Sequence, residues 1–134
     1  MVKSFKTYVL GASLNPQRYS NKAILMLKRF KIPTVAFGIK EGLAHGVKID
    51  SDLINYNDIH TVSIYLSPNN QKSYIDHVIS LNPKRIIFNP GTENNYFSQI
   101  LMSKNIYFES ACTLVLLSTN QYKTDKGNKT IQGE

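Results

Sequence analysis

Short runs of continuous apolar residues alternate along the chain with longer segments in which apolar residues recur every three or four positions. A continuous run is typical of a strand buried on both faces, and the longer period is typical of a helix with one apolar face. The pattern predicts strands at residues 5–10, 34–37, 61–66, 85–88 and 106–108. It predicts helices at about residues 20–30 and 67–82, a third beginning at Thr92 and a closing helix at 111–118.

This alternation predicts an α/β fold: a Rossmann-like, doubly wound and mainly parallel five-stranded sheet with helices on both faces. Right-handed crossovers favour the strand order 3-2-1-4-5. Residues 38–46 contain three glycines and are expected to form a loop, with a brief extended piece at 47–49. One domain is expected at residues 1–122. The polar residues 123–134 are predicted to be a flexible tail.

The chemistry-bearing segment of the sequence follows the first predicted strand, which ends abruptly at Gly11. A polar loop then leads to a helix that begins near Ser20. A strand, a glycine turn and a helix N-terminus together present backbone N–H groups to a phosphate. Ser13 adds a hydroxyl donor, and the planar guanidinium of Arg18 suits phosphate oxygens. The segment therefore predicts a loop that binds a phosphorylated ligand.

Further loops reach the same edge of the predicted sheet, because the carboxyl ends of parallel strands meet there. They follow the strands that end at Phe37, Leu66 and Phe88. The predicted ligand-binding residues are Gly11, Ala12, Ser13, Asn15, Pro16, Arg18, Tyr19, Ser20, Phe37, Gly38, Lys40, Ser67, Asn89 and Gly91.

The first loop also resembles a known family. Gly11-Ala12-Ser13, followed by Asn15-Pro16 and Arg18-Tyr19-Ser20, is similar to the first loop of the CoA-binding domain family. Its members are small stand-alone Rossmann-like proteins, similar to the CoA-binding domain of the succinyl-CoA synthetase α subunit. The resemblance covers residues 6–115. It implies a protein that binds CoA or acyl-CoA, and it implies no reaction.

Composition and charge narrow the choice of partner. The 134 residues carry a formal net charge of +7, which suits an anionic small-molecule nucleotide ligand. The lysines are scattered, and no RNA-binding signature is present, so nucleic acid is disfavoured. No apolar run approaches the ~20 residues that a membrane helix requires. With a single cysteine, Cys112, and no signal-peptide pattern at the N-terminus, the expected location is the cytoplasm.

No catalytic machinery is assigned from the sequence. A Walker lysine, a nucleophile elbow and a zinc-protease motif are all lacking. The histidines His45, His60 and His77 are scattered without a Cys or carboxylate at ligand spacing, so no metal site is predicted. The alternatives to CoA binding are an NAD(P)-dependent oxidoreductase and a regulatory nucleotide-binding module. The loop lacks the G-x-G-x-x-G pattern of the former. The sequence leaves open whether the protein binds a partner enzyme or forms a homo-oligomer.

Overall fold

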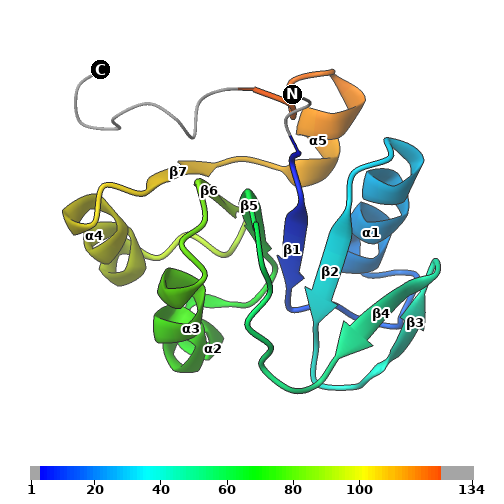
Figure 1. Ribbon diagram of the computed structural model, residues 1–134, viewed down its shortest axis with the longest axis horizontal. Coiled ribbons are helices and arrows are strands. Elements are labelled where there is room, and N and C mark those ends of the chain that lie inside the picture. The colour runs from blue at the N-terminus through cyan, green and yellow to red at the C-terminus, as the bar shows by residue number, and fades with distance from the viewer. Residues whose placement is uncertain (1–3, 125–134) are drawn as a thin grey trace.

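The computed structural model describes residues 4–124 and consists of one seven-stranded sheet with helices on both faces (Figure 1). The strand order is β3-β4-β2-β1-β5-β6-β7, and all neighbouring strands are parallel except β3 and β4. The α/β, Rossmann-like and mainly parallel architecture is confirmed. The strands are β1 (Thr7–Leu10), β2 (Thr34–Phe37), β3 (Gly42–Ala44), β4 (Val47–Asp50), β5 (Thr61–Ile64), β6 (Arg85–Phe88) and β7 (Tyr107–Ser110).

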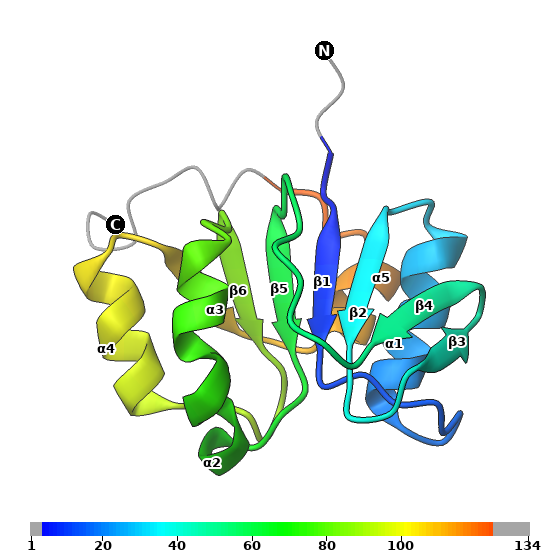
Figure 2. The same cartoon turned by 60° about the horizontal axis from the view of Figure 1, so that its bottom comes forward.

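Two apolar cores lie on opposite faces of the sheet, because successive strand residues point in opposite directions. In β1, Tyr8 and Leu10 face one core and Val9 faces the other. The helices are α1 (Tyr19–Arg29), α2 (Pro68–Gln71), the 3₁₀ helix η1 (Lys72–Tyr74), α3 (Ile75–Ser80), α4 (Asn95–Ser103) and α5 (Thr113–Ser118). Helices α3 and α4 cover the core of Tyr8, and α1 and α5 cover the core of Val9 (Figure 2).

The prediction of five strands is wrong, because two further strands are present: β3 lies in the glycine-rich segment 38–46, and β4 lies where only a brief extended piece was expected. β3 pairs with β4 in a hairpin whose two turn residues are His45 and Gly46. Their φ angles are 52° and 83°, and a two-residue type I′ turn requires a positive φ at both positions. The glycines mark a tight hairpin here, and β3, with three residues, is too short to show alternation.

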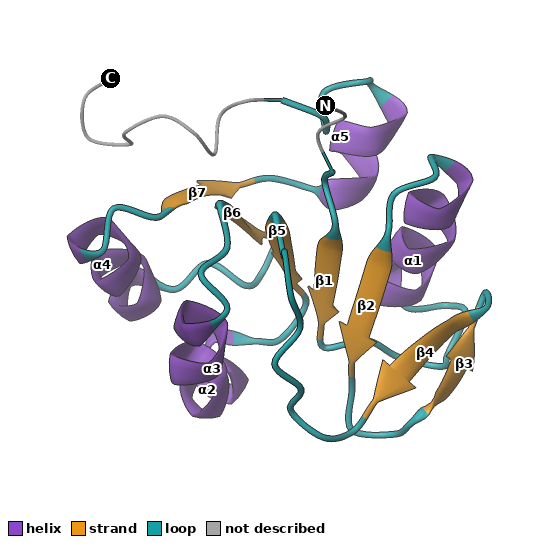
Figure 3. Cartoon of the chain, in the orientation of Figure 1, coloured by secondary structure: helices purple, strands orange, loops and turns teal. Residues whose placement is uncertain are grey.

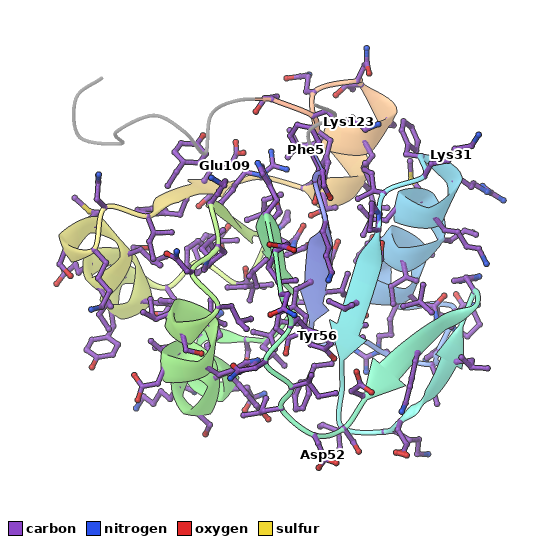
Figure 4. All side chains as sticks on the ribbon, viewed as in Figure 1. Phe5, Lys31, Asp52, Tyr56, Glu109 and Lys123 are labelled. Carbon is purple, nitrogen blue, oxygen red and sulfur yellow. The ribbon has the colours of Figure 1, made fainter. Side chains whose placement is uncertain are left out.

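The predicted strand order is also wrong. β5 pairs directly with β1, whereas the predicted order placed this strand beyond β2. The outer edge of β2 is occupied by β4, so the next strand reaches the sheet on the free side of β1. The connecting residues 51–60 form a loop rather than a helix (Figure 3). Tyr56 of this loop, labelled in Figure 4, packs its ring 5.1 Å from that of Tyr8.

Two predicted helices differ from the structure, one in its continuity and capping and one in where it starts. The helix expected at residues 67–82 is divided into α2, η1 and α3, and Pro68 begins it as expected, but the Ser67 side chain caps no N–H group. The helix expected to start at Thr92 starts later, with Asn94 as N-cap, and the Asn94 side chain accepts a hydrogen bond from the Phe97 N–H. Thr92 instead donates its hydroxyl to the Asn89 carbonyl, so it closes a turn before the helix.

The carboxyl ends of the parallel strands meet at one edge of the sheet, which lies at the bottom of Figure 2. The β1–α1 loop and α2 both lie at this edge. Of the predicted tail 123–134, residues 125–134 lie outside the described part of the chain. No helix within residues 4–124 has the length and apolar character to cross a membrane.

Candidate functional site

A cleft of about 790 Å³ opens at the carboxyl ends of β1, β2 and β5. This is the edge at which α/β sheets bind ligands. The cleft is lined by Gly11, Ala12, Ser13, Leu14, Asn15, Arg18, Tyr19, Ser20, Phe37, Gly38, Ile39, Lys40, Tyr65, Leu66, Asn69, Asn70, Ser73, Tyr74, Pro90 and Thr92. Most of the residues predicted from the β1–α1 loop and from the end of β2 are therefore brought together in one cavity.

Gly11 turns the chain out of β1 against the neighbouring strand. Its φ is +97°, and a Cβ atom there would lie 3.0 Å from the Leu66 Cδ2 and 3.0 Å from the Tyr65 carbonyl carbon. The N–H groups of Gly11 and Ala12 both donate to the Phe37 carbonyl, at 3.0 and 2.8 Å. These two amides are therefore used in hydrogen bonds to the end of β2. The glycine is thus required by its positive φ and by the close approach of Tyr65 and Leu66, which follow β5.

The N–H groups that stay available lie further along the loop. Within residues 4–124, those of Ser13, Leu14, Tyr19 and Ser20 donate to no protein acceptor. Tyr19 and Ser20 form the first turn of α1, and its N-cap residue, Arg18, makes no capping bond. Unsatisfied N–H groups at a helix start carry partial positive charge. The loop therefore offers two separate pairs of donors to an anion.

The cleft also has two cationic side chains and an aromatic wall. Arg18 and Lys40 are both exposed and both line the cavity, one from the end of the β1–α1 loop and one from the segment after β2. The rings of Phe37 and Tyr74, which also line the cavity, lie 5.2 Å apart. Ile39 is 93% exposed, which leaves a large apolar side chain at the mouth of the cleft. The cavity can therefore bind charged and apolar parts of one ligand together.

Four predicted residues do not line the cleft: Pro16, Ser67, Asn89 and Gly91. The Gly91 N–H donates to the Glu93 carboxylate. Asn89 is 2% exposed, and its amide nitrogen donates to the Ser63 hydroxyl and the Ile64 carbonyl. Its amide oxygen accepts from the Thr113 N–H. The Asn89 side chain joins β5 and β6 to the start of α5, so a structural role accounts for all of its bonds.

The segment after β5 was expected at this edge through Ser67, but the residues of it that line the cleft were missed. Leu66, Asn69, Asn70, Ser73 and Tyr74 line the cleft from this segment. The signal was available, since this segment follows the carboxyl end of a predicted strand. The polar residues of this segment were interpreted as the solvent-exposed face of a helix. The division of this helix by η1, at Lys72–Tyr74, could not be foreseen from the periodicity.

The titratable groups in and near the site include a neutral Tyr65 and, within residues 4–124, no cluster that could hold a metal ion. Burial raises the pKa of the Tyr65 phenol well above its usual value, so this residue is neutral at physiological pH. Cys112, the N-cap residue of α5, is a half-buried free thiol outside the cleft lining. Among residues 4–124, no three His, Cys, Asp or Glu side chains are grouped so that they could hold a metal ion.

Comparison with known proteins gives a match for nearly the whole folded chain. A family model described as a CoA binding domain matches residues 6–118. Among solved structures, a crystal structure of a protein described as uncharacterized has a TM-score of 0.85 and 37% identity, and the match covers 90% of this chain and 99% of that chain. No curated protein gives a match.

Two more distant structures share the fold. A hypothetical protein from Pyrococcus horikoshii OT3 has a TM-score of 0.78 and 20% identity, covering 87% of this chain and 84% of its own. The protein called cell-free ID.343 from Thermus thermophilus has a TM-score of 0.77 and 16% identity, covering 88% of this chain and 90% of its own. At these identities the similarity describes the architecture alone.

Proposed function

The chain belongs to the CoA-binding domain family, and from this premise we propose that the cleft at the carboxyl edge binds CoA with its diphosphate on the β1–α1 loop. The diphosphate would accept hydrogen bonds from the Ser13 and Leu14 amides and from the first turn of α1. The Arg18 guanidinium and the Lys40 ammonium would pair with phosphate oxygens. The adenine and the pantetheine arm would use the apolar walls.

One observation supports this proposal above the others. Four N–H groups of one loop, at Ser13, Leu14, Tyr19 and Ser20, have no acceptor among residues 4–124, and all four residues line the same cleft. Hydrogen bonds to a charged acceptor contribute roughly 1.5–3 kcal/mol each, so these donors would add substantially to the binding free energy of an anion. The exposed Arg18 lies beside these donors in sequence and lines the same cavity.

The shape of the cleft suits a ligand with both polar and apolar parts. Its volume, about 790 Å³, lies within the range of roughly 300–1,000 Å³ that is usual for small-molecule sites. Phe37, Leu66 and Tyr74 supply apolar surface to the same cleft. CoA combines phosphates with an adenine ring and a long neutral arm, which matches this division.

Isothermal titration calorimetry with CoA, acetyl-CoA, NAD⁺, NADP⁺ and ATP tests the proposal. CoA is expected to bind more tightly than the two nicotinamide dinucleotides, because its pantetheine arm has no counterpart in them. Comparison of CoA with acetyl-CoA then decides whether the free thiol or the acyl form is preferred. Absence of heat with CoA and acetyl-CoA would contradict the proposal, and tighter binding of NAD⁺ or NADP⁺ would favour a dinucleotide site.

A further inference from the structure

A chain of hydrogen bonds joins the β3–β4 hairpin to the ligand loop. His45, in the hairpin turn, places its Nε2 2.7 Å from the Asn21 Oδ1. The Asn21 amide nitrogen, on α1, donates to the Ser13 carbonyl at 2.9 Å. Asn21 is 3% exposed, so this side chain lies between hairpin and loop with little access to solvent.

The direction of both bonds follows from the chemistry of the amide. A carbonyl can only accept, so the group that Asn21 presents to Ser13 must be its NH₂ group. Its oxygen therefore faces His45, and the His45 Nε2 must carry the proton. The neutral Nε2–H imidazole and the imidazolium both meet this requirement. Both ends of the buried Asn21 amide are satisfied only while His45 is present.

The hairpin contacts the loop and α1 at two further points. A Cβ atom on Gly42 would lie 2.9 Å from the Leu14 Cδ2, so the backbone of β3 packs directly on this loop side chain. The Lys28 ammonium, near the end of α1, donates to the His45 carbonyl at 2.6 Å. The backbone position of the turn is therefore held independently of the His45 imidazole.

We propose that His45, acting through Asn21, is a positioning residue that holds the Ser13–Leu14 segment with its N–H groups directed into the cleft. The proposal rests on the function proposed above. Within residues 4–124 the Ser13 and Leu14 amides have no partner of their own, and the Ser13 carbonyl between them is the backbone group of this pair that accepts a hydrogen bond from a buried side chain. A donor pair that is already oriented binds an anion more tightly, because no ordering is left for the binding step.

Two substitutions separate positioning from stability. His45→Asn suits the left-handed backbone of the type I′ turn, since Asn adopts positive φ readily, but its side chain is too short to reach Asn21. His45→Gln is less favourable in that backbone, yet its amide nitrogen extends about as far as the histidine Nε2 and can donate to Asn21. If His45 only stabilises the turn, His45→Asn should bind CoA at least as tightly as His45→Gln. If His45 positions the loop, His45→Gln should bind CoA more tightly than His45→Asn.

The variants are compared by CoA titration and thermal unfolding, with Leu43→Ser as control. Leu43 lies in the same hairpin and is 71% exposed, and it does not line the cleft. His45→Asn is expected to weaken CoA binding roughly three- to tenfold, the effect of one hydrogen bond. Its melting temperature should stay near that of His45→Gln, because the better turn residue offsets the donor that the buried Asn21 oxygen loses. His45→Gln should keep most of the affinity in spite of a melting temperature below that of wild type.

A second measurement does not depend on CoA. Nitrogen-15 relaxation of the ligand-free protein should show greater mobility of the Ser13 and Leu14 amides in His45→Asn, with the β1 amides unchanged. Normal mobility of these amides in His45→Asn would overturn the proposal even if wild-type protein binds no CoA. Equal CoA affinity of wild type and His45→Asn would also overturn it, whereas failure of wild type to bind CoA contradicts only the proposed function.

Discussion

Arg18 ends the β1–α1 loop at the N-cap position of α1. Its side chain makes no capping bond, is exposed and lines the cleft. The guanidinium is therefore available to a ligand without the loss of any bond that the structure records within residues 4–124. This is the arrangement expected of a residue that contributes to binding and not to stability.

We predict that Arg18→Ala weakens CoA binding roughly ten- to a hundredfold, from the loss of about 1.5–3 kcal/mol of charged hydrogen bonding. Arg18→Lys should recover part of the loss, because the ammonium keeps the charge without the two-pronged geometry. Calorimetric titration measures the change. Arg29→Ala, at the opposite end of α1, is the matched control and should bind CoA like wild type. Equal affinities in all four proteins would remove Arg18 from the site.

His77 gives the protein a pH-dependent contribution to stability. Burial lowers the pKa of His77 below its usual value of 6.5, and its Nε2 lies 3.0 Å from the Tyr8 hydroxyl. Because the folded pKa lies below the unfolded one, the unfolded chain binds the proton more tightly. The stabilisation is therefore complete above pH 6.5 and is lost as the pH falls through the lowered pKa.

We predict that His77→Gln reduces this loss of stability in acid. The glutamine oxygen can accept the Tyr8 hydroxyl proton and does not titrate, so the melting temperature should decline less between about pH 7 and pH 5 than in wild type. Thermal unfolding across this range measures the difference. Parallel pH profiles of the two proteins would show that another group causes the acid sensitivity.

At the scale of elements, the segment after α5 is fixed to the sheet by one aromatic residue. Tyr122 is 2% exposed, and its hydroxyl lies 2.6 Å from that of Thr7 in β1. The fully buried Arg85 of β6 donates to the Tyr122 carbonyl at 3.0 Å and lies 4.4 Å from the centre of its ring. The charge of Arg85 is shared with Glu109 of β7, at 3.8 Å (labelled in Figure 4). Three strands therefore depend on this contact.

We predict a graded loss of stability at Tyr122. Tyr122→Phe removes the bond to Thr7 and should cost about 0.5–1.5 kcal/mol. Tyr122→Ala also leaves a cavity above a buried guanidinium and should cost roughly 3–5 kcal/mol. Denaturant unfolding measures both, with Tyr96→Ala as control, because Tyr96 is 66% exposed. Equal stability of Tyr122→Ala and Tyr96→Ala would show that the C-terminal segment does not depend on this anchor.

The same scale shows which elements the sequence could predict. The strands at residues 34–37 and 85–88 are short continuous apolar runs, and these coincide with β2 and β6. The hairpin of β3 and β4 could not be recognised, because β3 is three residues long and its pairing depends on two positive φ angles at the turn. Without that hairpin, the edge of β2 seemed free, and the wrong strand order followed.

The candidate site was predictable to the extent that it follows from the carboxyl ends of strands. The loop after β1 and the end of β2 line the cleft as anticipated, because their strands are central and parallel. The partners of individual groups were not predictable. That the Gly11 and Ala12 amides bind Phe37, and that the Asn89 amide is fully used inside the sheet, depends on distances between residues far apart in sequence.

At the scale of the whole molecule, the net charge of the protein is opposite in sign to that of the proposed ligand. The chain has a formal net charge of +7, and CoA carries its negative charge on three phosphates. Within the described chain, the cleft adds the exposed Arg18 and Lys40 to this general field. Salt screens such attraction beyond a Debye length of about 8 Å at physiological ionic strength. Part of the affinity for CoA should therefore depend on salt.

We predict that CoA affinity falls roughly three- to tenfold between about 0.05 and 0.5 M NaCl, because exposed cations lose much of their attraction over this range. Dephospho-CoA lacks the 3′-phosphate and should show a shallower dependence on salt. Calorimetric titration of both ligands at several salt concentrations measures the two slopes. If affinity for CoA did not change with salt, the exposed cations would contribute little, and binding would rest on the backbone amides and apolar walls. If the two slopes were equal, the 3′-phosphate would lie in solvent, away from Arg18 and Lys40.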